Sequence, residues 1–513
     1  MVTKTNSIGL NGLEGYVVEA EADCTYADEM QLEIVGLPDA TVKEAKGRIV
    51  SAVTNAGFRL PRQRIIVNLA PAGIRKEGSV YDLPMMLGIL SCTGQIAPPP
   101  GDGIFVGEIS LSGQIRPCSG VLAMVIAAKE KGFRKVYVPA ENAAEGAVIE
   151  GVEVYPVTDV RSLVEHLSGR CPISPKTSDK AAFACRQRNF DSDFRDVVGQ
   201  HSARRACEIA AAGGHNMLFI GPPGTGKSML AKCLPSILPD MTEEEMIESS
   251  KIYSVAGKLS EDRPLIVNRP FVKTNQNVSL AGLTGGGASP MPGLVSLAHN
   301  GVLFLDETAE FSPKILESLR QPLEDGSVTV NRVKRNVTYP SSIMLVCAMN
   351  PCPCGNFGHP TARCTCSPAQ VDRYIHRISG PLLDRIDLQV ELPPVPVTQI
   401  KRAAPAEDSG SIKRRVDAAR KRQQQRFAGE KFSCNAGMTP AALKKYCHMT
   451  EEAVTLLNNI FEKMTLSMRA YDKIVKISQT ITDLSGGEII TADAVTEAVY
   501  FRSLDKKYWN RSI

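Results

Sequence analysis

The chain has 513 residues, of which 43% are hydrophobic and 22% charged, and its formal net charge is +4. This length exceeds what one hydrophobic core supports, and the composition excludes a disordered or fibrous protein. Because no apolar run is long enough to span a bilayer and no signal-peptide pattern opens the chain, we expect a cytoplasmic protein without a membrane partner. In that compartment the fourteen cysteines do not indicate a disulfide framework.

The order of residue patterns predicts three folded domains joined by two connectors. Residues 1–167 mix short β-type runs with helical stretches, which predicts an α+β domain. Residues 168–195 are polar and broken by prolines, as a linker is. Residues 196–395 alternate strands with helices, which predicts an α/β nucleotide-binding domain. A hinge at 396–410 then leads into a helical domain at 411–513.

A glycine-rich loop stands between the short apolar run 216–220 and a helical pattern that begins at Met229. Strand, glycine loop and helix form the context in which the pattern G-x-x-x-x-G-K-S cradles phosphates through backbone N–H groups and the helix N-terminus. We expect the lysine to reach the β- and γ-phosphates of ATP and the serine hydroxyl to hold Mg²⁺. The loop residues are Gly221, Pro222, Pro223, Gly224, Thr225, Gly226, Lys227 and Ser228.

Two apolar runs downstream end in residues suited to a Mg²⁺-ATP site. The first ends in Asp306 and Glu307, which we expect to bind the metal and to orient an attacking water, respectively. The second ends in Asn350, which we expect to contact the γ-phosphate or the water. Alone, each pattern is also typical of an ordinary strand edge.

Two arginines follow in positions that suit phosphoryl-charge stabilisation. Arg385 lies at the expected edge of the nucleotide-binding domain, and because Lys227 already serves its own site, a neighbour's site is the better assignment. Arg469, in the helical domain, offers a second cation. The alternative for both is a surface salt bridge.

Together these motifs, in this order, resemble an AAA+ ATPase. Four longer blocks, at residues 297–307, 321–326, 349–355 and 379–387, resemble the magnesium-chelatase-like family called YifB or ComM. The resemblance covers nearly the whole chain. The chain departs from the family pattern at residues 274–276, where Thr-Asn-Gln replaces a Pro-His-His segment, and at residues 478–482.

The resemblance implies an α/β fold class, with an AAA+ P-loop module, an N-terminal α+β Lon-protease-like domain and a C-terminal helical lid. It also implies a homo-hexameric ring and, as for ComM, ATP-driven branch migration or helicase activity on single-stranded or branched DNA during natural transformation. By motif match, Arg385 becomes the trans-acting arginine finger and Arg469 the second sensor. The rival interpretations are a chelatase subunit and a non-motor ATP switch or scaffold for protein partners.

The first domain lacks the residues of a Lon-type Ser-Lys dyad. The segment from Lys76 to Asp82 resembles the serine segment, but Val80 stands where the nucleophile would be. Leu122 replaces the lysine in the second segment. Neither side chain forms or activates a nucleophile, so we treat Lys76 and Ser79 as loop residues and expect no peptidase activity.

Cys352, Cys354, Cys364 and Cys366 form two C-x-C pairs that close a turn-rich loop. Such thiols suit a tetrahedral Zn²⁺ site, with His359 as a substitute ligand; four buried or free thiols are the alternative.

Residues 324–339 alternate as a hairpin does and place Arg332, Lys334 and Arg335 at its tip. In related rings this insertion faces the central pore, so we expect these cations to contact DNA phosphates. A second basic run, at 413–426, is usually a solvated helix face, with DNA contact as the alternative.

Overall fold

The computed structural model describes residues 2–178, 190–287, 290–332, 335–395, 406–464 and 467–509. Part of the predicted linker (179–189) and most of the predicted hinge (396–405) lie outside them. The chain folds into two compact units. Unit 1 contains Met1–Gln187, Glu243–Val267 and Val333–Tyr339, and unit 2 contains Arg188–Thr242, Asn268–Arg332 and Pro340–Ile513.

Unit 1 is built on a seven-stranded mixed sheet in the order β3-β4-β2-β1-β5-β8-β9. The long pairs β1–β2 and β2–β4 are antiparallel, and the remaining neighbours are parallel. The strands are β1 (Thr3–Asn11), β2 (Glu14–Tyr26), β3 (Gln31–Val35), β4 (Gln63–Ala70), β5 (Gly103–Phe105), β8 (Lys135–Pro139) and β9 (Glu153–Val157), with the small pair β6 (Glu108–Ile109) and β7 (Ile115–Arg116) beside them.

The helices of unit 1 pack their apolar faces on this sheet. The first, α1 (Ala40–Asn55), begins at Asp39, whose carboxylate caps the N–H of Val42 at 2.7 Å. Its buried positions recur at helical spacing, as a one-sided helix requires. The others are α2 (Asp82–Cys92), α3 (Val121–Glu130), η1 (Ala140–Asn142), α4 (Ala143–Gly146) and α5 (Val160–Leu167).

Helix α9 (Glu243–Val255) joins unit 1 although it comes from a later part of the chain. Its Ser254 carbonyl accepts from the N–H of Gly120 at 2.9 Å, and its Ser254 hydroxyl donates to Glu145 at 2.6 Å. These bonds attach the end of α9 to the start of α3 and to α4.

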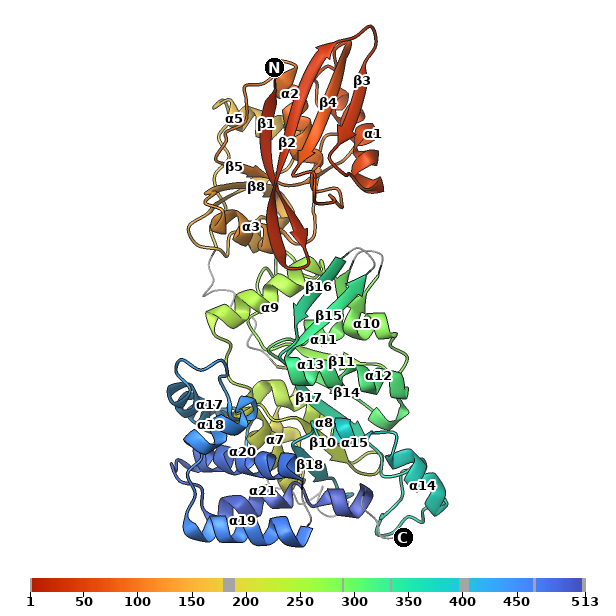
Figure 1. Cartoon of the computed structure of the whole chain (residues 1–513), viewed down its shortest axis with the longest axis vertical. Helices are drawn as coiled ribbons and strands as arrows, with labels where there is room; N and C mark the ends of the chain where they lie inside the picture. Colours follow the sequence, from red (N-terminus) through yellow and green to blue (C-terminus); the bar gives the residue numbers. More distant parts are fainter. Residues whose placement is uncertain are drawn as a thin grey trace. The chain divides into compact units, whose positions relative to one another are not determined.

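Unit 2 is organised around a five-stranded parallel sheet in the order β11-β14-β17-β10-β18. All residues of β10 (Met217–Ile220), β14 (Val302–Leu305) and β17 (Met344–Met349) are buried, as expected of strands covered on both faces. The edge strands are β11 (Phe271–Thr274) and β18 (Leu388–Glu391). Figure 1 shows the central strands side by side below α13. A mixed α/β fold with a parallel sheet is therefore confirmed for this part of the chain.

Short helices and hairpins connect the strands of unit 2. They are η2 (Phe194–Asp196), α7 (His201–Gly213), α8 (Lys227–Cys233), η3 (Leu234–Ile237), α10 (Leu280–Thr284), β12 (Gly285–Gly286), β13 (Met291–Pro292), α11 (Leu294–Leu297), η4 (Thr308–Glu310), α12 (Pro313–Ser318), α13 (Arg320–Asp325), β15 (Ser327–Arg332), β16 (Arg335–Pro340), α14 (Pro368–Ile375) and α15 (Gly380–Leu383). Of these, β16 contributes its residues up to Tyr339 to unit 1.

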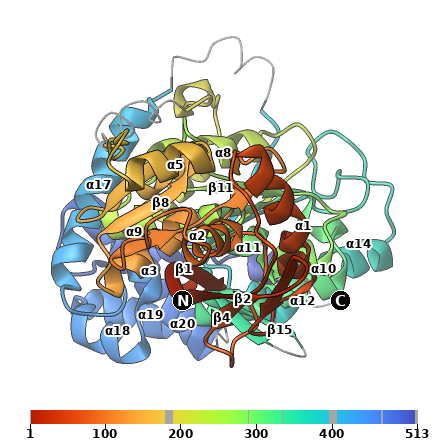
Figure 2. The ribbon, with the colours of Figure 1, turned by 90° about the horizontal axis from the view of Figure 1, so that it is seen from above.

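The C-terminal helices gather on one side of unit 2, as the blue ribbon in Figure 2 shows. Helix α7 contacts β18 and also α17 and α20, so it joins the sheet to this group. The group comprises α17 (Ser409–Arg426), η5 (Asn435–Gly437), α18 (Pro440–Tyr446), α19 (Glu451–Met464), α20 (Met468–Ser485), α21 (Ala492–Tyr500) and η6 (Asp505–Trp509). No helix among the described residues is long and apolar enough to cross a membrane.

The basic run of α17 is used for packing inside unit 2. Five of the seven cations in this run bind acids or carbonyls on other elements, so the helix face is not fully solvated. The partners are Asp240 for Lys413, Glu208 for Arg415, Ala211 for Arg420 and Asp483 for Arg422 and Arg426.

Candidate nucleotide-binding site and cysteine group

The glycine-rich loop connects the buried strand β10 to helix α8, the arrangement expected from the sequence. Gly226 precedes the helix with φ of 91°, a conformation that favours glycine, and Lys227 is the first helical residue. The loop thus ends at a helix N-terminus, where backbone N–H groups are free to bind an anion.

Lys227 folds back over the loop that precedes it. Its ammonium donates to the carbonyl of Gly221 at 2.6 Å, to that of Pro222 at 2.8 Å and to Oδ1 of Asn350 at 3.1 Å. Burial lowers the pKa of Lys227 to about 8, against the raising effect of Asp306 and Glu307. The contact with Asn350 joins the loop to the end of β17, which pairs in parallel with β10.

Ser228 and Asp306 meet at the same end of the sheet. The serine hydroxyl donates to both carboxylate oxygens, at 3.2 and 3.1 Å, and the Lys273 ammonium lies 2.9 Å from Oδ2. A hydroxyl beside a carboxylate is an oxygen pair that suits Mg²⁺, so these residues fit the metal that a phosphate loop uses. Lys273 comes from β11, which pairs with β14.

Glu307 is held in an uncommon backbone conformation immediately after β14. Its φ is 51°, in the left-handed region, and its side chain is exposed. The amide of Gln276 donates to its carboxylate. A strained, exposed carboxylate beside a phosphate loop is the kind of outlier that functional sites retain.

The two arginines form their observed contacts with residues outside their own chain's phosphate loop. Arg385 donates to the carbonyl of Pro381 at 2.9 Å and forms an ion pair with Glu324. Arg469 is 65% exposed and lies 3.9 Å from Asp384. Within the described residues, neither forms a hydrogen bond or ion pair with residues 221–228.

A buried polar network joins the segment after Arg385 to the lid helix α20. Asp387 lies 3.1 Å from the Lys473 ammonium and 3.3 Å from Nδ1 of His215. The other ring nitrogen of His215 lies 2.8 Å from the Thr480 hydroxyl. Burial alone would raise the pKa of Asp387, but Lys473 and His215 hold that pKa well below its usual range.

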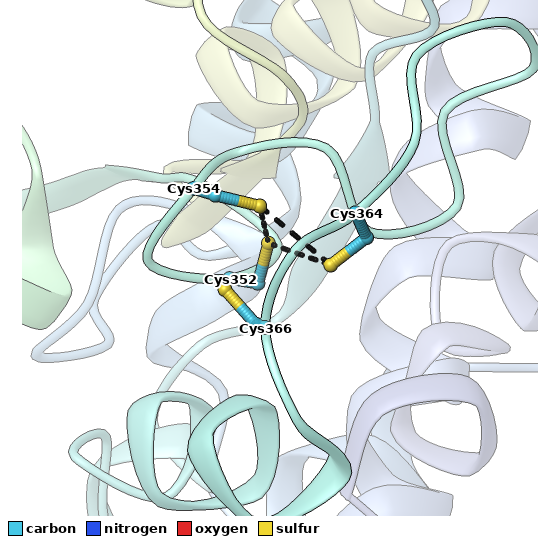
Figure 3. A group of neighbouring side chains, drawn as sticks. All are labelled: Cys352, Cys354, Cys364 and Cys366. Carbon is cyan, nitrogen blue, oxygen red and sulfur yellow. Dashed lines mark hydrogen bonds between the residues drawn. The ribbon is translucent and has the colours of Figure 1, made fainter.

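The four cysteines of the two C-x-C pairs come together after β17. Their sulfur atoms all lie within 4.8 Å of one another, and Figure 3 shows them converging from the two arms of one loop. His359 is not part of the group, because its Nδ1 accepts from the N–H groups of Thr361 and Ala362 at 3.1 and 2.9 Å. The group can therefore hold a metal ion with four thiolates.

The predicted DNA-contacting cations are only partly covered by the structure. The predicted hairpin is present as β15 and β16, which end and begin at Arg332 and Arg335. Lys334 lies outside the described residues, as do the side chains of the two arginines.

In unit 1, Lys76 and Ser79 have structural partners. The Lys76 side chain is buried and donates to the carbonyl of Pro71, and the Ser79 hydroxyl donates to Glu108. Leu122, which the sequence comparison predicts to replace a Lon-type lysine, is fully buried.

Sequence reasoning missed two residues that contact the site carboxylates, Lys273 and Gln276. Both residues reach the site because β11 lies next to β14 in the sheet. The sequence did not predict β11 as a strand, because it has no long apolar run. The only signal was the departure from the family pattern at 274–276, which includes Gln276.

Comparison with protein families covers most of the chain. The family described as magnesium chelatase, subunit ChlI, matches residues 193–400. Subunit ChlI of Mg-chelatase matches residues 20–142, and magnesium chelatase, subunit ChlI C-terminal, matches residues 406–502.

Individual proteins are similar over nearly their whole length. The chain is 39% identical to the uncharacterized protein YifB of Escherichia coli, over 93% of this chain and 92% of that protein. It is 39% identical to competence protein ComM of Haemophilus influenzae, over 92% of each chain. A shorter match, 28% identical over 32% of each chain, is to Lon protease 2 of Bacillus subtilis.

Proposed function

The chain belongs to the magnesium-chelatase-like family that includes YifB and ComM, and we propose from this membership that it is a Mg²⁺-dependent AAA+ ATPase that acts as a motor on DNA. The observation that carries the proposal is the meeting of Lys227 with Asn350, and of Ser228 with Asp306, at one end of the parallel sheet. Three separate segments supply these side chains, which is the arrangement that phosphoryl transfer requires.

Each residue has a distinct task in this proposal. The backbone N–H groups of Gly224, Thr225 and Gly226 bind the phosphates, and Lys227 neutralises phosphate charge. Ser228 and Asp306 hold Mg²⁺, which when bound supplies charge neutralisation at the transferred phosphoryl group. Glu307 orients the attacking water, and Asn350 positions that water or the γ-phosphate.

Arg385 completes a neighbour's site across a subunit boundary in a homo-hexamer, and Arg469, on the lid, is the second sensor. Support comes from Arg385, which contacts Pro381 and Glu324 rather than the phosphate loop of its own chain. Mixing tests this directly. Arg385→Ala and Lys227→Ala should each lack turnover, and a mixture should regain part of it, because mixed rings contain interfaces with both residues intact. Absence of recovery in assembled mixed rings would contradict action in trans.

Single-stranded or branched DNA is the proposed substrate, in the manner suggested by the competence protein among the relatives. The domain layout that goes with it is a Lon-protease-like domain (1–167) without peptidase activity, a linker (168–195), an ATPase module (196–395), a hinge (396–410) and a helical lid (411–513). Arg332, Lys334 and Arg335 are the proposed DNA contacts. ATP and Mg²⁺ are the cofactors.

The test is ATP turnover by the purified protein alone, with single-stranded DNA and with a four-way junction. DNA should stimulate turnover, Lys227→Ala should abolish it, and Lys232→Ala, on the exposed face of the same helix, should not. Turnover that is indifferent to DNA would instead favour a chelatase-type subunit, which the matched families suggest, or an ATP switch for protein partners.

A further inference from the structure

Residues 350–367, between β17 and α14, contain no helix or strand, yet they form an ordered turn-rich loop. Connections of more than about 15 residues without secondary structure are uncommon in compact domains and need their own source of order. The loop has little apolar material of its own, but it brings four sulfur atoms together in its centre.

The spacing of these sulfurs suits one tetrahedral metal ion. Zinc–thiolate bonds of about 2.3 Å place the corners of a tetrahedron about 3.8 Å apart. The sulfur of Cys352 lies 3.4 Å from that of Cys354 and 3.7 Å from that of Cys364, and the latter two lie 3.6 Å apart. A disulfide would need about 2.05 Å, so these distances describe a cluster rather than bonded pairs.

The surroundings also suit thiolates. The N–H of Phe357 donates to the Cys352 sulfur at 3.3 Å, the kind of outer contact that orients a metal ligand. Cys352 is fully buried in the same apolar cluster as the strand residues Ile220 and Met349, so the loop is anchored in the core of unit 2.

The same loop touches the phosphate loop. Gly355 has φ of 80°, and a Cβ added there would lie 2.5 Å from Cδ of Pro223. The turn that contains Cys352 and Cys354 is therefore packed directly on the glycine-rich loop. Asn350, the first residue of the cysteine-containing loop 350–367, contacts the Lys227 ammonium.

We propose that Cys352, Cys354, Cys364 and Cys366 bind one Zn²⁺ ion, and that this zinc loop braces the phosphate loop through Gly355 and Asn350. Binding removes the four thiol protons and replaces them with four zinc–sulfur bonds, so no oxidant is required. The bracing role rests on the proposed ATP site, whereas the zinc site does not.

Metal content tests the zinc site in the full chain. Protein purified without chelators should contain about one zinc per chain, and replacement by Co²⁺ should give the absorption bands of a tetrahedral cobalt thiolate. Cys352→Ser and Cys364→Ser should lose the metal, and Cys171→Ser, at an exposed cysteine, should retain it. If the two variants fail to fold, the metal content and cobalt spectrum of the unaltered chain still decide. Four free thiols or disulfides in place of metal, after incubation with Zn²⁺, would overturn the site.

A second pair of variants tests the bracing contact with metal content unchanged. Gly355→Ala should weaken binding of a fluorescent ATP analogue by about tenfold, because the added methyl group displaces Pro223. Gly358→Ala is the matched control, since φ there is 73° but an added Cβ meets nothing within 4 Å. Equal affinities in both variants would overturn the brace and leave the zinc site standing. Loss of analogue binding by the unaltered, zinc-loaded chain would instead count against the ATP site.

Discussion

Removing one partner of the buried pair Asp387–Lys473 should strongly destabilise unit 2. Both side chains are close to nine-tenths buried, at 11% and 12% exposed, and their charged atoms lie 3.1 Å apart. Replacing Lys473 by Met leaves a buried carboxylate without its cation. Removing one partner of a buried pair costs about 3–5 kcal/mol, so Lys473→Met should lower the free energy of unfolding by that amount.

Urea unfolding can be followed through Trp509, the only tryptophan, which packs on the core of unit 2. The double variant Lys473→Met with Asp387→Leu should recover much of the loss, because it leaves neither charge unpaired. Lys445→Met is the matched control, since Lys445 is 63% exposed and pairs with Glu430 at a similar distance, and it should unfold like the unaltered chain.

The stability contributed by Asp387 should decrease as the solution becomes acidic. Because the folded-state pKa of Asp387 is depressed, its stabilisation is present above the unfolded pKa of about 3.9 and is lost as the pH falls below it. The difference in the free energy of unfolding between the unaltered chain and Asp387→Asn should therefore stay constant down to about pH 4 and become smaller at lower pH. A loss below about 1 kcal/mol in Lys473→Met, matching Lys445→Met, would refute the reasoning, because it would mean that solvent screens the pair.

Two further predictions concern the nucleotide site. With a pKa of about 8, Lys227 is mostly neutral above that pH, so ATP binding at pH 9 should take up a proton and weaken by about tenfold per pH unit. Calorimetry in buffers of different ionisation enthalpy measures the proton, and its absence at pH 9 would contradict the lowered pKa. Gln276→Ala should release Glu307 and raise basal turnover, by up to about fivefold for a lost exposed hydrogen bond of ~1 kcal/mol, whereas Asn277→Ala should not. Unchanged turnover in Gln276→Ala would show that the bond does not restrain Glu307.

Local patterns predict the parts of the site that are contiguous in sequence. The loop 221–228, the Asp306–Glu307 pair and Asn350 each follow a short apolar run, and parallel strands place such ends at one edge of a sheet. The cysteine pairs were equally visible, because their short spacing limits how far apart the sulfurs lie.

Contacts between distant segments were not predictable in the same way. Lys273 reaches Asp306 only because β11 pairs with β14, and the four residues of β11 include a lysine and a threonine. The sequence did not reveal the ion pairs of the α17 cations, because their acidic partners are mostly far from them along the chain. Helix α9 joins unit 1 through the Ser254–Glu145 hydrogen bond, and no local sequence pattern predicts this contact.

The most direct test of the proposed ATPase site is to measure nucleotide binding and turnover in the same variant, Glu307→Gln. The amide keeps the size of the side chain but cannot accept a proton or orient water as a carboxylate does. We predict analogue binding within about threefold of the unaltered chain and turnover lowered by at least about 100-fold. Normal hydrolysis by Glu307→Gln would contradict the assignment of this carboxylate and, with it, the proposed site.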